Sequence, residues 1–128
     1  GSILREGSDV AIIACGVMVS EAIRAAEELS KNGVEATVVD MHTIKPLDTE
    51  LIDELVQECR GIVTAEDHSV IGGLGSAVSE HLSYTGGVPI RMVGVSDRFG
   101  ESGEPGELMD LMGITYGDIV DSCESLLS

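Results

Sequence analysis

The sequence predicts an α/β domain in which helices cover both faces of a mostly parallel, five-stranded sheet, a three-layer α/β/α arrangement. Aliphatic runs alternate along the chain with segments whose apolar residues recur at helical spacing. Only two tyrosines, one phenylalanine and no tryptophan are present, and buried parallel strands favour such an aliphatic core. The length of 128 residues fits one domain.

The first half of the chain predicts three strands and two helices. Segment 3–5 is a short edge strand, expected to run antiparallel to the others, and the apolar run 10–14 is a buried central strand. The helix that follows ends at Asn32-Gly33, where glycine allows the left-handed conformation of a C-terminal cap. Strand 35–40 comes next, and Asp48 is the expected N-cap of the second helix.

The second half predicts two more strands and three helices. Segment 61–65 is a buried strand, and the helix after the next glycine cluster ends at 85–87. Segment 89–95 is the last strand. A short helix is expected over 105–113, with proline in its first turn. Residues 115–118 have the pattern of a capping box for a closing helix.

The charge balance restricts the partners of the chain. Twenty-three acidic and seven basic residues give a formal net charge of −16, so the chain repels polyanions, and we exclude nucleic acids and anionic membranes as partners. The acidity is explained by solubility, and a basic partner surface is the alternative.

The cysteines and the N-terminal residues add three expectations. Cys15, Cys59 and Cys123 lack Cys-x-x-Cys spacing, which argues against a disulfide framework or a zinc site and favours buried thiols in a reducing cytoplasm. No apolar stretch approaches the roughly 20 residues of a membrane span. We expect Gly1-Ser2 to be a cloning remnant and residues 3–128 to form the domain.

The segment 63–78 is the main candidate site. An apolar strand leads into a predicted loop of two acids and a histidine, and a glycine cluster then opens a helix. Open α/β sheets bind ligands at the carboxyl ends of their strands. The candidate ligand or subunit contacts are Glu66, Asp67, His68, Gly72, Gly73 and Gly75.

These residues allow two interpretations each. The acids and His68 provide acid/base groups, or the acids cap backbone amides or contact a neighbouring subunit. The glycines place an anion at a helix N-terminus, or they let the helix pack closely on the sheet. The residues favour the structural interpretation in both cases. At the glycines, a helix terminus contributes only about 0.3–1 kcal/mol towards an anion, whereas micromolar binding takes about 8 kcal/mol.

Several site classes are not supported. The turn 15–18 has one glycine, so it lacks the Gly-x-Gly-x-x-Gly loop of a dinucleotide site. The three histidines have unrelated spacings, which argues against a metal site. Ser69 and Ser76 lack the Gly-x-Ser-x-Gly elbow of hydrolases. The residues thus give a scaffold without a complete catalytic constellation, and we predict no catalytic and no metal-binding residue.

Five motifs, taken together and in this order, resemble the C-terminal domain of transketolase. The resemblance covers essentially the whole chain. The motifs are Gly-Ser-Asp-Val-Ala-Ile-Ile-Ala-Cys-Gly from Gly7, Thr-Ile-Lys-Pro-Leu-Asp from Thr43, Val-Thr-Ala-Glu-Asp-His from Val63, Gly-Gly-Leu-Gly-Ser-Ala-Val from Gly72 and Asp-Arg-Phe-Gly-Glu-Ser-Gly from Asp97.

The resemblance implies a role in a thiamine diphosphate enzyme of the pentose phosphate pathway. Such enzymes use thiamine diphosphate and magnesium to move two-carbon ketol units between sugar phosphates. Their cofactor lies between pyrophosphate- and pyrimidine-binding domains, whose motifs are absent from these 128 residues. The resemblance therefore implies a non-catalytic segment that serves assembly, and possible regulation, of a dimeric or other homo-oligomeric enzyme. Those two domains are the expected partners, in the same chain or in a separate subunit.

Other enzymes have C-terminal domains related to that of transketolase, and these domains provide the alternative assignments. They occur in the β subunits of 2-oxo acid dehydrogenases, where the domain helps dock the acyltransferase core, and in deoxyxylulose-phosphate synthase. The stretch 43–48 and the Glu-Asp-His before Gly72 are more similar to transketolase than to either of these enzymes. A module that binds a partner protein or a small anion near Gly72 is the alternative function.

Overall fold

The computed structural model describes residues 1–69, 73–95 and 115–128. The predicted short helix over 105–113 lies outside these residues. The described elements are β1 (Ser2–Arg5), β2 (Val10–Ala14), α1 (Met18–Lys31), β3 (Ala36–Asp40), α2 (Thr49–Glu58), β4 (Ile62–Ser69), α3 (Leu74–Thr85), β5 (Ile90–Val95) and α5 (Tyr116–Leu127).

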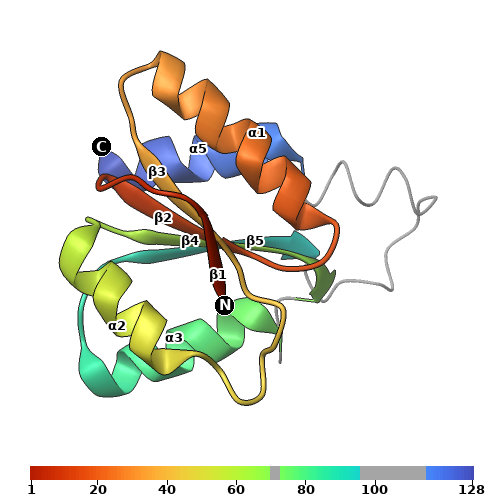
Figure 1. Cartoon of the computed structure of the whole chain (residues 1–128), viewed down its shortest axis with the longest axis vertical. Coiled ribbons are helices and arrows are strands. Elements are labelled where there is room, and N and C mark those ends of the chain that lie inside the picture. The colour runs from red at the N-terminus through yellow and green to blue at the C-terminus, as the bar shows by residue number, and fades with distance from the viewer. Residues whose placement is uncertain (70–72, 96–114) are drawn as a thin grey trace.

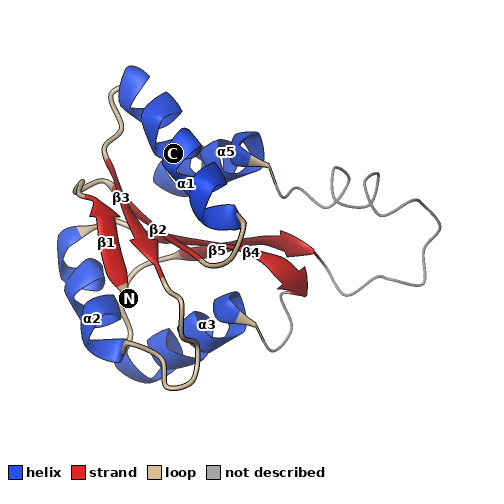
Figure 2. Ribbon diagram, turned by 45° about the vertical axis from the view of Figure 1, so that its right-hand side comes forward, coloured by secondary structure: helices blue, strands red, loops and turns tan. Residues whose placement is uncertain are grey.

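The five strands form one sheet in the order β1-β3-β2-β4-β5. β2 pairs in parallel with β3 and with β4, and β4 pairs in parallel with β5. β1 runs antiparallel to β3 at one edge of the sheet (Figure 2). The predicted mostly parallel sheet with an antiparallel first strand at its edge is confirmed.

Helices cover both faces of the sheet. α1 and α5 lie on one face, and α2 and α3 lie on the other (Figure 1). Every residue of β2 is fully buried, and its side chains alternate between two cores. Val10, Ile12 and Ala14 pack toward α1 and α5, while Ala11 and Ile13 pack toward α2 and α3. No helix in the described ranges is long and apolar enough to cross a membrane.

The predicted helix caps are present. Gly33 has a φ of 83° just after α1, which is the left-handed region that favours glycine. Asp48 Oδ1 accepts a hydrogen bond from the Leu51 N–H at 3.3 Å at the start of α2. Thr115 and Asp118 form a reciprocal capping box at the start of α5. Local sequence signals therefore set three helix ends.

One strand is longer than predicted. The apolar run predicts a strand over 61–65, with Glu66, Asp67 and His68 in a loop, but β4 continues to Ser69. Ser69 pairs with Val95 of β5, after a shift in register that follows Ala65. The prediction of a loop was wrong because pairing with a neighbouring strand, which a hydrophobic pattern does not reveal, extends β4 through polar residues.

Gly7 lies where the backbone before β2 meets the start of β3. Its N–H donates to Thr37 Oγ1 at 2.9 Å. A Cβ added at Gly7 would lie 2.5 Å from the carbonyl carbon of Glu35 and 2.6 Å from the nitrogen of Ala36. Both contacts are with backbone, which cannot move aside as a flexible side chain can.

We therefore expect Gly7→Ala to lower the free energy of unfolding by about 1–3 kcal/mol, the usual cost of overpacking. The matched control is Gly117→Ala in α5, where the added Cβ meets only Thr115 Oγ1, at 3.7 Å. That change should stabilise the helix by up to about 1 kcal/mol. Urea unfolding followed by circular dichroism measures both, and equal stabilities would contradict the packing argument.

Candidate functional site at the carboxyl edge of the sheet

Glu66 joins β4 to the start of α3. Its side chain is fully buried. Oε1 accepts the Leu74 N–H at 2.8 Å, and Oε2 accepts the Gly75 N–H at 2.7 Å. The first amides of a helix have no partner within it, and its N-terminus carries partial positive charge, so a carboxylate here is stabilised. Glu66 thus acts as a capping carboxylate supplied from the sheet.

The glycines at the start of α3 explain why the cap comes from β4. Gly73 occupies the N-cap position and has no side chain to accept a hydrogen bond. A Cβ at Gly75 would lie 2.7 Å from Met92 Sδ of β5 and 2.9 Å from Thr64 Oγ1 of β4. The glycine at position 75 therefore allows the first turn of α3 to pack closely on the sheet.

Asp67 lies on the other side of β4. Successive side chains of a strand point to opposite faces, and the Asp67 carboxylate lies against Gly16, between β2 and α1. A Cβ at Gly16 would be 3.1 Å from Asp67 Oδ1, and Gly16 has a φ of 62°. Glu66 and Asp67 therefore face opposite layers and do not form a carboxylate pair for acid/base chemistry.

The structure brings together only part of the predicted set. Glu66, Gly73 and Gly75 meet at the start of α3, whereas Asp67 lies at the start of α1. His68 belongs to β4, but its side chain lies outside the described part of the structure, as does Gly72. Within the described ranges, no group of three or more histidine, cysteine, aspartate or glutamate side chains is arranged to hold a metal ion.

Cys15 belongs to the same edge, although its position in the sequence indicates only a buried thiol. It follows β2 and is 8% exposed. Burial has the largest effect on the Cys15 thiol, and the negative charges of Glu66, Asp67 and Asp40 add to it. Together they raise the pKa of the thiol to about 11. The carboxyl ends of adjacent parallel strands lie at the same edge of a sheet. This rule could have placed Cys15, at the end of β2, near the acids at the end of β4. The thiol is held in its protonated, weakly nucleophilic form.

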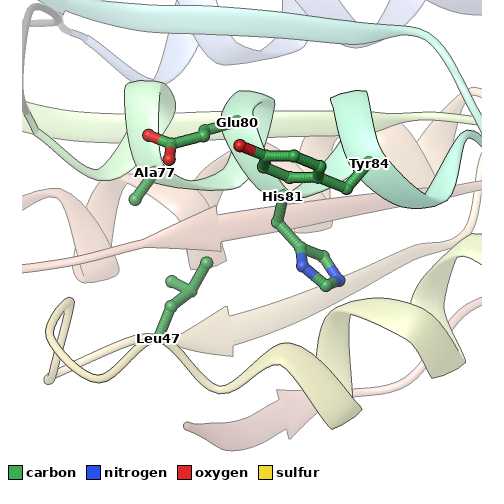
Figure 3. Close-up of a pocket in the computed structure, with 5 residues that line it drawn as sticks. All are labelled: Leu47, Ala77, Glu80, His81 and Tyr84. Atoms are coloured by element: carbon green, nitrogen blue, oxygen red, sulfur yellow. The ribbon is translucent and has the colours of Figure 1, made fainter.

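A second feature, which sequence reasoning missed, lies between α3 and the loop before α2. Five residues line a hollow of about 270 Å³, which we name the α3 hollow (Figure 3). They are Leu47, Ala77, Glu80, His81 and Tyr84. His81 is linked to α2 through a 2.8 Å contact between its Nε2 and Asp53 Oδ1.

The fold is a three-layer α/β/α domain in which a buried carboxylate of β4 caps α3. Comparison with known proteins identifies the family of this domain. The family model described as "Transketolase, C-terminal domain" matches residues 1–119. The chain belongs to the transketolase C-terminal domain family.

Relatives and solved structures agree with this family. The chain is 50% identical to the 6-deoxy-6-sulfo-D-fructose transketolase subunit SqwH of Clostridium sp. (strain MSTE9), over 93% of this chain and 37% of that protein. It is 42% identical to 1-deoxy-D-xylulose-5-phosphate synthase 1 of Geobacter sulfurreducens, over 100% of this chain and 20% of that protein. A structure described as "Split gene transketolase, inactive beta4 tetramer" is 47% identical with a TM-score of 0.90, over 98% of this chain and 41% of that chain. The chain thus spans well under half the length of these proteins.

We expect changes at Glu66 to weaken the junction between β4 and α3. Glu66→Gln places an amide donor against a backbone N–H and should cost about 1–3 kcal/mol of unfolding free energy, as buried unsatisfied groups do. Glu80→Gln on the exposed side of the same helix is the control and should stay within about 0.5 kcal/mol. Urea unfolding tests both; a Glu66→Gln variant as stable as the control would refute the capping role.

The Cys15 thiol should resist alkylation in the folded chain. The shift of its pKa from 9.0 to about 11 lowers the thiolate fraction at pH 8 about a hundredfold. Treatment with iodoacetamide at pH 8, followed by peptide mass spectrometry, should show Cys15 modified at least about a hundredfold more slowly than in urea. The rate should rise with pH up to the raised pKa. Equal rates in the folded and unfolded chains would contradict this protonation state.

Proposed function

We propose that this domain serves the assembly of a transketolase-like enzyme and supplies none of its catalytic groups. The observation that carries the proposal is the 47% identity and 0.90 TM-score, over 98% of this chain, to a split-gene transketolase. In this proposal, thiamine diphosphate and magnesium are bound by pyrophosphate- and pyrimidine-binding domains of the same enzyme. Those domains belong to the same polypeptide or to a separate subunit.

The chemistry of the carboxyl edge supports this division of roles. The two first-turn amides that a phosphate would use are already bonded to Glu66. Asp67 faces the other layer, and the raised pKa of Cys15 keeps its thiol protonated. These residues do not fit a site for thiamine diphosphate, its metal or a small anion. The geometry therefore favours a structural role for the segment over the anion-binding alternative.

The reaction of the complete enzyme is proposed to be transfer of a two-carbon ketol unit between sugar phosphates, as in the pentose phosphate pathway. The 50% identity to a 6-deoxy-6-sulfo-D-fructose transketolase subunit adds sulfonated ketoses to the candidate substrates. A second candidate is the C-terminal domain of a 1-deoxy-D-xylulose-5-phosphate synthase, because the alignment with that enzyme covers the whole chain at 42% identity.

The proposed setting is a homo-oligomeric, dimeric enzyme of the cytoplasm. Cys15, Cys59 and Cys123 are all buried and unpaired, which suits a reducing compartment. A split-gene relative is described as a tetramer, which supports self-association of such domains.

We expect the purified chain, supplied with thiamine diphosphate, magnesium, a ketose phosphate donor and an aldose phosphate acceptor, to show no turnover. Adding the cofactor-binding part of the same enzyme should give ketol transfer, measured by mass spectrometry of the new sugar phosphate. The cofactor-binding part alone is the control and should be less active than the mixture.

Two results would overturn the assignment. Turnover by the 128 residues alone would show that the domain is catalytic, and equal activity with and without it would remove the assembly role. Formation of 1-deoxy-D-xylulose 5-phosphate by the mixture, without ketol transfer, would establish the second candidate function.

A further inference from the structure

We propose that the α3 hollow receives a basic side chain, arginine or lysine, from the cofactor-binding part of the enzyme. The inference rests on the proposed assembly function and specifies the surface and the chemistry of the contact. Its evidence is the position of an exposed aromatic ring, an exposed carboxylate and two aliphatic side chains around one hollow.

Tyr84 is the most exposed large hydrophobic residue in the described part of the chain. It is 83% exposed near the end of α3, whereas an aromatic ring usually gains stability by burial. Glu80 lies four residues earlier, and side chains at this spacing are neighbours on one helix face. Figure 3 shows the Glu80 carboxylate and the Tyr84 ring along the same side of the helix. A ring face beside a carboxylate is a favourable environment for a guanidinium or ammonium group.

The remaining walls suit the aliphatic part of a basic side chain. Leu47, from the loop before α2, and Ala77, one turn before Glu80 and His81, line the same hollow. Arginine and lysine bury their methylene groups against such surface while the charged group reaches polar partners. The volume of about 270 Å³ is below the roughly 300–1,000 Å³ of small-molecule pockets. The hollow therefore fits one side chain of a protein partner.

The charges carried by α2 and α3 favour a basic occupant of the α3 hollow. His81 Nε2 lies 2.8 Å from Asp53 Oδ1, so the imidazole already has an acidic neighbour. The carboxylate that lines the α3 hollow is that of Glu80. Glu80 forms no ion pair with any residue in the described ranges. α2 and α3 together carry five acidic residues and no lysine or arginine. The five acids are Glu50, Asp53, Glu54, Glu58 and Glu80.

A second copy of this chain is a poorer occupant. α2 and α3 carry five acidic residues and no lysine or arginine, so contact with the same surface of a second copy would bring like charges together, whereas self-association through other surfaces is unaffected. The rest of the enzyme is the better candidate, because the chain spans only 37% of its SqwH relative and 41% of its split-gene neighbour. The partner surface is therefore expected to present arginine or lysine to this hollow.

Binding of the chain to the separately purified cofactor-binding part, measured by isothermal titration calorimetry, tests the proposal. Glu80→Lys and Tyr84→Ala should each raise the Kd about tenfold or more, because they remove the carboxylate and the ring that hold the cation. Tyr84→Phe keeps the ring and should bind as the wild type does. Added salt should weaken the binding of the wild type more than that of Glu80→Lys.

The matched control is Glu124→Lys, an exposed position of α5 on the opposite layer, which changes the net charge by the same amount. Its Kd should stay within about twofold of the wild type. Circular dichroism melts confirm that each variant is folded.

Each other outcome overturns the inference. If the wild type restores activity and all variants bind equally, the hollow is not the contact but the proposed function stands. If the wild type neither binds nor restores activity, both fail. If the chain alone sediments as an oligomer that Glu80→Lys dissociates while partner binding is unchanged, the occupant is a second copy.

Discussion

The buried carboxylate of Glu66 fixes the position of α3 relative to the sheet. A charge with no exposed surface is tolerated because two backbone amides donate to it, at 2.8 and 2.7 Å, at the positive end of a helix. Gly73 cannot provide a cap, and Gly75 lets the helix approach β4 and β5. The close packing and the buried charge therefore depend on each other.

The same junction separates groups that are adjacent in the sequence. β4 turns Glu66 toward α3 and Asp67 toward α1, because a strand alternates its side chains between two faces. Each acid lies at the start of a different helix. Glu66 thus holds the first turn of α3 on the sheet, while Asp67 lies against Gly16 before α1.

In the proposed assembly, the contact with the partner is made by α2 and α3. The α2 and α3 face combines acidic side chains with the exposed ring of Tyr84, and a surface of this composition suits a basic partner more than a second acidic copy. Binding there leaves the buried junction at Glu66 undisturbed, since the α3 hollow lies further along the helix. The stabilising junction and the proposed partner contact therefore use different parts of α3.

The sequence by itself determined the layers, the antiparallel edge strand, three helix caps and the family motifs. These features depend on periodicity and on cap residues close in the chain, such as Asp48 with Leu51. Only the tertiary structure decided that β4 extends to Ser69 and that Glu66 and Asp67 face opposite layers. It also decided that Leu47 and Tyr84 line the same hollow. Strand pairing and helix packing join residues far apart in the chain, and local patterns do not encode those distances.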